Sequence, residues 1–147
     1  MSTTRSTEPL IVERSYNAPV AKVWAALTNL EQIRQWYFDL AEFKAEVGFK
    51  FEFVAGESAG CEEGYLHKCE ITEVIPNKKL AYSWRYDGYE GDSEVSFEIF
   101  EEGGGSLVRI THVGLETFPD TPMFAKSNFN GGWTHFIGAL QDFVEKG

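Results

Sequence analysis

Residues 80–86 read LAYSWRY, a stretch in which large apolar side chains alternate with small or polar ones. The apolar positions are held by Leu80, Tyr82, Trp84 and Tyr86. A period of two residues is typical of a β-strand that buries one face. This stretch therefore predicts a strand whose inner face is mostly aromatic.

Other stretches repeat the same period on both sides of this strand. Their alternating residues are Leu10, Val12 and Tyr16; Phe49, Phe51, Phe53 and Ala55; Cys69 and Ile71; Val95, Phe97 and Ile99; and Val108, Ile110 and His112. Turn-forming residues stand between several of them, at Pro76-Asn77, at residues 87–92 and at residues 103–106. Short strands joined by tight turns predict an antiparallel sheet with one covered face.

Helical signals follow the first strand and return at the end of the chain. Pro19 suits the first turn of a helix, because a proline there gives up no hydrogen bond. Asn29 is expected to cap a second short helix, with Gln32 as its capping-box partner, and that helix should end near Trp36-Tyr37. A final helix is predicted over residues 128–145. Its apolar stripe consists of Trp133, Phe136, Ile137, Leu140, Phe143 and Val144.

The order of these elements defines the expected fold class, which is α+β. We expect a disordered N-terminus over residues 1–9 and a single domain over residues 10–147. The expected architecture is a large twisted antiparallel sheet of about six to seven strands, with two short helices after the first strand and a long C-terminal helix. A helix is only ~10–12 Å across and cannot cover so wide a sheet, so either the sheet curls around the helix or a gap stays between them, and a gap lined by aromatic residues would be a ligand pocket.

Four sequence motifs point to a known superfamily. They are VERSYNAP at residues 12–19, EVIP at 73–76, VRITHVG at 108–114 and GW at 132–133. With these motifs the chain resembles the SRPBCC superfamily, also described as START-like or birch-pollen-allergen-like, and within it the branch related to the C-terminal domain of the activator of the heat-shock-protein-90 ATPase. The resemblance implies a helix-grip fold with a cavity between the sheet and the C-terminal helix. Members bind lipids, sterols or polyketides, and some are cyclases or co-chaperones, so the fold does not imply one function.

The residues expected to line this cavity lie on the inner faces of the strands and helices. They are Trp36, Phe51, Phe53, Tyr82, Trp84, Phe97, Ile110, His112, Trp133, Phe136 and Leu140. A mostly apolar wall with a few polar groups is the usual composition of a small-molecule site. The alternative is that the same aromatic side chains pack the core, where a buried Tyr or Trp also needs a hydrogen-bond partner.

Two polar side chains are in phase with apolar neighbours on their strands. His112 either orients a ligand inside the cavity or is a core histidine whose nitrogens are satisfied by the protein, and we favour the core interpretation. Arg14 either faces inward, where an unpaired charge is costly, or reaches the rim and pairs at the surface, which we favour. No residue is assigned a catalytic role.

Composition and spacing argue against several other kinds of site. The net charge is −10, and no cluster of Lys or Arg offers a surface for nucleic acid or for an anionic membrane. Cys61, Cys69, His67 and His135 lack the spacing of a zinc site, so we expect no metal and no cofactor. Residues 103–106 read GGGS and predict a hairpin turn, since no Gly-Lys-Ser/Thr sequence follows to make a phosphate loop.

The cellular compartment is inferred from the cysteines and from hydropathy. The chain has 2 cysteines, too few for a disulfide framework. It has no apolar run near ~20 residues, and its start lacks the apolar core of a signal peptide. We therefore expect free thiols and a cytoplasmic location.

Three functions remain open. The one that we expect is binding of a small apolar or amphipathic molecule, such as a lipid, a sterol or an aromatic polyketide-like compound, without catalysis. The second is a co-chaperone-like module that contacts a chaperone through an exposed apolar patch and has a closed core. The third is a cyclase or dehydratase acting on a polyketide-like substrate, which predicts a perturbed pKa at His112 or at an inward-facing acid.

Overall fold

The computed structural model describes residues 9–37, 40, 42–55, 65–118 and 126–146. In chain order the elements are β1 (Leu10–Tyr16), α1 (Val20–Thr28), α2 (Leu30–Trp36), β2 (Lys50–Ala55), β3 (Tyr65–Ile75), β4 (Lys79–Tyr86), β5 (Ser93–Glu102), β6 (Gly105–Val113), the 3₁₀ helix η2 (Leu115–Thr117) and α3 (Lys126–Lys146). Of the predicted disordered N-terminus, residues 1–8 lie outside the described part of the chain.

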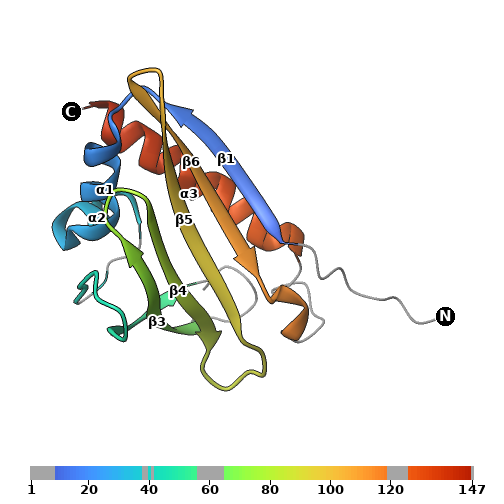
Figure 1. Cartoon of the computed structure of the whole chain (residues 1–147). Coiled ribbons are helices and arrows are strands. Elements are labelled where there is room, and N and C mark those ends of the chain that lie inside the picture. The colour runs from blue at the N-terminus through green and yellow to red at the C-terminus, as the bar shows by residue number, and fades with distance from the viewer. Residues whose placement is uncertain (1–8, 38–39, 41, 56–64, 119–125, 147) are drawn as a thin grey trace.

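The strands form one antiparallel sheet in the order β1-β6-β5-β4-β3-β2. Figure 1 shows the curved sheet with the long helix α3 running along one of its faces. Helix α3 contacts β1, β6, α1 and α2, and α1 also contacts β5 and β6. These contacts confirm the predicted α+β helix-grip fold, in which the helices cover the inner face of the sheet.

The start of α2 follows the capping residue predicted from the sequence, whereas the starts of α1 and α3 differ from the prediction. The side-chain Oδ1 of Asn29 accepts a hydrogen bond from the backbone N–H of Gln32 at 3.2 Å, which confirms the predicted cap of α2. Pro19 precedes its helix rather than opening it, since its backbone is extended (φ −70°, ψ 156°) and α1 begins at Val20. Helix α3 begins at Lys126 rather than at residue 128, because its first three residues, at 126–128, are polar and show no apolar period.

The glycines at residues 103–105 close the hairpin between β5 and β6. Glu102 pairs with Gly105, so Gly103 and Gly104 alone form the turn. Both have positive φ angles, 52° and 91°, which glycine adopts without steric cost. The stretch is therefore a tight turn, as predicted, and not a phosphate loop.

Strand β4 carries the aromatic inner face that its alternation predicts. Leu80, Tyr82, Trp84 and Tyr86 are all buried, with exposed fractions between 2% and 4%. The ring of Trp84 lies 5.2 Å from the ring of Trp133 in α3, measured between centroids. The core of the protein therefore lies between this face of the sheet and α3.

The outer face of the sheet has one irregularity, a β-bulge in β3. Ile71 pairs with Tyr82 of β4, whereas Glu73 pairs with Ala81, so Thr72 is an extra residue on its strand. A bulge of this kind lets two successive side chains point to the same face of the sheet. Thr72 and Glu73 consequently both lie on the outer face.

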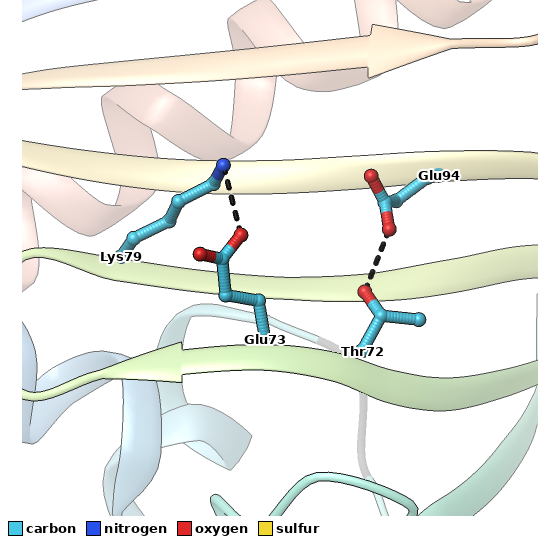
Figure 2. Close-up of polar contacts among 4 residues, drawn as sticks. All are labelled: Thr72, Glu73, Lys79 and Glu94. Carbon is cyan, nitrogen blue, oxygen red and sulfur yellow. Dashed lines mark hydrogen bonds and ion pairs between the residues drawn. The ribbon is translucent and has the colours of Figure 1, made fainter.

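Polar contacts from the bulge reach across the neighbouring strand (Figure 2). The Thr72 hydroxyl donates a hydrogen bond to the carboxylate of Glu94 in β5 at 2.7 Å, and Lys79 forms an ion pair with Glu73 at 3.0 Å. Ala81, which lies on β4 opposite the bulge, is only 1% exposed. The bulge thus covers β4 with polar side chains on the face that is turned away from the core.

Candidate functional site

A small cavity lies between the inner face of the sheet and the two short helices. Its volume is about 10 Å³, which is room for about one water molecule. The described residues that line it are Leu27, Ile33, Trp36, Tyr37, Leu40, Phe43, Phe51, Leu80, Tyr82 and Phe97. The indole N–H of Trp36 is already used, because it donates to the backbone carbonyl of Ala26 at 2.9 Å. The other polar side-chain groups among these described lining residues are the hydroxyls of two tyrosines.

These two hydroxyls, of Tyr37 and Tyr82, are hydrogen-bonded to each other with 2.7 Å between the oxygens. Tyr82 lies in the middle of β4 and is 2% exposed, whereas Tyr37 directly follows α2 and is only partly buried. Burial raises the pKa of both phenols well above the usual value. Both therefore stay neutral at ordinary pH, one donating and the other accepting.

The ring of Tyr37 is enclosed by other aromatic rings. Its centroid lies 4.9 Å from the ring of Trp36 and 4.9 Å from that of Phe136, which it meets edge-on. Phe53 meets it edge-on at 6.3 Å, and Trp133 is stacked with it at 6.4 Å. Tyr37 thus fills an aromatic space between α2, α3 and β2.

His112 lies deeper in the core, in a chain of hydrogen bonds. The indole N–H of Trp133 donates to Nδ1 of His112 at 3.0 Å, so the ring proton must be on Nε2, which is 2.8 Å from the Ser93 hydroxyl oxygen. The Ser93 hydroxyl donates in turn to the backbone carbonyl of Trp84 at 2.7 Å. Burial lowers the pKa of His112 to about 3, so the ring is neutral. The geometry is that of a core histidine satisfied by the protein.

Aromatic rings of α3 and of the strands are in contact beneath α3. Trp133 of α3 lies 5.8 Å from the rings of both Phe97 and His112, in addition to its contact with Trp84. The sequence predicts a cavity between α3 and the strands at this point. Around Trp133 the rings of the two layers are in direct contact, and the cavity described above lies toward α2.

The residues predicted to line a ligand site are divided between the cavity and the surrounding core. Those that line the cavity are Trp36, Phe51, Tyr82 and Phe97. Those buried elsewhere in the same core are Phe53, Trp84, Ile110, His112, Trp133 and Leu140. Phe136 is partly buried and reaches the cavity region through its contact with Tyr37. Ligand contact by any of them stays a prediction.

Six lining residues are absent from the sequence prediction: Leu27, Ile33, Tyr37, Leu40, Phe43 and Leu80. Leu27 and Ile33 lie on the inner faces of α1 and α2, where helical spacing could have indicated them. Tyr37, Leu40 and Phe43 belong to the segment between α2 and β2, which has no regular period. The only signal for Tyr37 is its position next to Trp36.

Arg14 lies on the α3 side of β1 but stays at the surface. Its Nη1 donates to the side-chain oxygen of Gln141 in α3 at 3.2 Å, and both residues are exposed or nearly so. A Cβ at Gly138 would come within 3.0 Å of the same nitrogen, so the arginine lies flat against the helix. This geometry is the surface alternative, in which Arg14 does not enter the core.

The thiols and the other histidines do not form a metal site in the described part of the chain. No group of three or more His, Cys, Asp or Glu residues there could hold a metal ion. Burial raises the pKa of the Cys69 thiol, and His67 is buried against the rings of Phe53 and Tyr86, each 4.6 Å away. Cys61 lies outside the described residues.

The curved antiparallel sheet, the two short helices and the long covering helix define a helix-grip protein of the SRPBCC type. The chain belongs to the family described as activator of Hsp90 ATPase homolog 1-like proteins, whose sequence pattern matches residues 17–145. A comparison with curated proteins found no match.

Solved structures with the same fold support this assignment. Protein MLL2253 from Mesorhizobium loti is 26% identical, with a TM-score of 0.77 over 95% of this chain and 98% of that protein. CalU16 from Micromonospora echinospora is 26% identical, with a TM-score of 0.72 over 92% of this chain and 75% of that protein. The Aha1 dimer from Colwellia psychrerythraea is similar in fold, with 22% identity and a TM-score of 0.70 over 94% of this chain and 96% of that one.

Hydropathy adds one observation about the helices. Within the part of the chain that the structure describes, no helix is both long and apolar enough to span a bilayer.

Proposed function

We propose that this protein binds one small, largely apolar molecule between the inner face of its sheet and the two short helices α1 and α2. The observation that carries the proposal is the hydrogen-bonded pair of Tyr37 and Tyr82, which lies beside a cavity with otherwise apolar walls. Sites for small molecules combine such walls with a few polar groups that orient the ligand. The ligand classes known in the superfamily, lipids, sterols and polyketides, are consistent with this composition.

A ligand needs more room than the cavity has in this conformation. Ligand sites typically measure roughly 300–1,000 Å³, whereas this cavity measures about 10 Å³. Tyr37, Leu40 and Phe43 have the most freedom to move aside, because they belong to no helix or strand. Binding is therefore expected to shift the protein toward a conformation that is open at this segment.

A titration followed by amide NMR tests the proposal. The unmodified protein is mixed with a fatty acid, a flavonoid and a sterol in turn. We expect saturable shifts at the amides of Tyr37, Phe51 and Tyr82, and no shifts at Ile11 and Val54, which are each 52% exposed and serve as internal controls. The absence of saturable shifts with every compound, in a folded protein, would contradict ligand binding.

A second candidate is an interaction module that contacts a chaperone through its surface. The close packing around Trp133 favours it, as do Ile11 and Val113 near the β1–β6 edge, which are 52% and 37% exposed. Single exposed apolar side chains are common on protein surfaces, so this support is weaker than that of the tyrosine pair. Shifts at Ile11 and Val113 on addition of a chaperone, without effects at Tyr82, would favour this candidate.

An acid–base enzyme has the least support. A catalytic histidine needs a ring nitrogen within hydrogen-bond reach of the substrate. Both nitrogens of His112 are engaged with Trp133 and Ser93, and burial accounts for its low pKa.

A further inference from the structure

Tyr37 is placed as a bound aromatic ligand would be. Its ring is surrounded by the rings of Trp36, Phe136 and Trp133, and its hydroxyl meets the buried hydroxyl of Tyr82 at 2.7 Å. Aromatic rings around a flat ring, with one hydrogen bond at its end, are the contacts that a hydroxyaryl compound would need. In this structure the same ring contacts and hydrogen bond are made with Tyr37, a side chain of the protein itself.

The two tyrosines differ in their freedom to move. Tyr82 lies in β4, which is hydrogen-bonded to β3 on one side and to β5 on the other, so its hydroxyl is fixed in place. Tyr37 lies just beyond the end of α2, and its backbone N–H is anchored to the carbonyl of Ile33 at 2.8 Å. Because Tyr37 belongs to no helix or strand, its side chain is expected to leave this space more readily than that of Tyr82 while the backbone keeps this bond.

We infer that the Tyr37 side chain occupies the ligand site when no ligand is bound, and that the ligand displaces it. A neutral hydroxyaryl group, either a phenol or the phenolic end of a larger apolar molecule, enters as the Tyr37 ring leaves, and its hydroxyl takes over the hydrogen bond to Tyr82. This inference rests on the proposed function and narrows it to one chemical class.

The residues around this site favour a ligand that carries a hydroxyl group and no charge. Without a ligand hydroxyl, displacement of Tyr37 would leave the buried Tyr82 hydroxyl without its present partner, and such a loss lowers affinity by about tenfold. The described lining residues include no Lys, Arg or His, so a carboxylate would be buried there without a counter-charge. Fatty-acid carboxylates are therefore expected to bind less tightly than phenols.

The test compares phenol with toluene, which has nearly the same size but has a methyl group in place of the hydroxyl. The unmodified chain, Tyr37→Phe, Tyr37→Ala and Tyr37→Ala/Tyr82→Phe are titrated with each compound by amide NMR. Tyr89→Ala is the matched control, because Tyr89 is 44% exposed and does not line the cavity. Tyr37→Phe keeps the ring and so provides a folded variant if Tyr37→Ala does not fold.

Displacement of Tyr37 by the ligand predicts a specific pattern of affinities for phenol and toluene. Phenol should bind the unmodified chain weakly but saturably, with shifts at Tyr82, and should bind Tyr37→Ala about tenfold or more tightly, because no internal ring competes. In Tyr37→Ala phenol should bind about tenfold more tightly than toluene, and the added Tyr82→Phe should abolish that preference. Tyr37→Phe should also bind phenol more tightly than the unmodified chain, because its ring has no hydroxyl to hold it. Tyr89→Ala should match the unmodified chain.

Two results would overturn the inference. The first is equal affinity of Tyr37→Ala for phenol and toluene, which would leave apolar binding intact but remove the role of Tyr82. The second is phenol binding by the Tyr37 variants without any binding by the unmodified chain, which would make Tyr37 a permanent part of the core. Failure of the proposed function differs from both, since then neither the unmodified chain nor any folded variant binds any compound.

Discussion

The indole N–H of Trp133 in α3 donates a hydrogen bond to Nδ1 of His112 in β6, with 3.0 Å between the nitrogens. The two side chains are 3% and 0% exposed. Trp133 also packs against Trp84 of β4 and Phe97 of β5. One side chain therefore connects the long helix to three neighbouring strands.

Replacement of Trp133 by alanine should lower the free energy of unfolding by about 3–5 kcal/mol, as for a packed aromatic core residue. Trp133→Phe keeps an aromatic ring and should lower it less. The loss that remains, about 1–3 kcal/mol, comes mainly from leaving Nδ1 of His112 without its donor. Urea unfolding curves measure both. Thr134→Ala, one residue along α3 and exposed, is the control and should change stability by less than about 0.5 kcal/mol. A small loss for Trp133→Ala would instead mean that Trp133 borders empty space.

The buried neutral state of His112 predicts a loss of stability in mild acid. Burial lowers its pKa from 6.5 to about 3, so below pH 6.5 the unfolded chain takes up a proton that the folded chain does not. The stabilisation is complete above pH 6.5 and is lost as the pH falls toward 3, at about 1.4 kcal/mol for each pH unit. Urea unfolding between about pH 7 and about pH 5 measures this slope before most carboxylates titrate.

Two histidine variants isolate the contribution of His112. His112→Gln should unfold with a slope that is reduced by the amount assigned to this residue, although the variant is less stable at every pH. His135→Gln, which changes an exposed histidine, should keep the slope of the unmodified protein. An unchanged slope in His112→Gln would show that another group is responsible.

The sequence predicts those parts of the fold that depend on neighbours along the chain. The alternation in β4 places Tyr82 and Trp84 on the buried face, and the spacing of Asn29 and Gln32 gives the start of α2. The pair Gly103-Gly104 gives the β5–β6 turn. Each of these depends on a period or a contact of a few residues, which a sequence displays directly.

The site is harder to predict because its contacts are distant in the chain. Tyr37 lies beyond the last residue of α2, where no period continues, and its partner Tyr82 is 45 residues away. The bulge at Thr72 likewise depends on how β3 pairs with β4, and alternation alone does not reveal an extra residue. Whether aromatic residues enclose a cavity or fill it depends on small differences in packed volume, which no pattern of residue types records.

The ion pair between Lys79 and Glu73 on the outer face should contribute little to stability. The side chains are 32% and 45% exposed and lie 3.0 Å apart (Figure 2). Exposed pairs of this kind contribute about 0.2–1 kcal/mol and are weakened by salt. A double-mutant cycle of Lys79→Ala and Glu73→Ala, measured by urea unfolding at low and high salt, should give a coupling energy in this range that falls with salt. A coupling energy clearly larger than 1 kcal/mol at high salt would contradict this account.

The hydroxyls of Tyr37 and Tyr82 should show a strong coupling. Tyr37→Phe leaves the buried Tyr82 hydroxyl without its present partner and should lower the free energy of unfolding by about 1–3 kcal/mol. Tyr82→Phe should cost a similar amount, because it likewise removes this hydrogen bond from a buried hydroxyl, that of Tyr37. The double variant has no hydroxyl left to satisfy and should be more stable than Tyr37→Phe alone. Urea unfolding of the three variants measures the cycle. Additive losses would mean that the two hydroxyls act independently, and the reason for assigning Tyr82 a role in ligand recognition would then disappear.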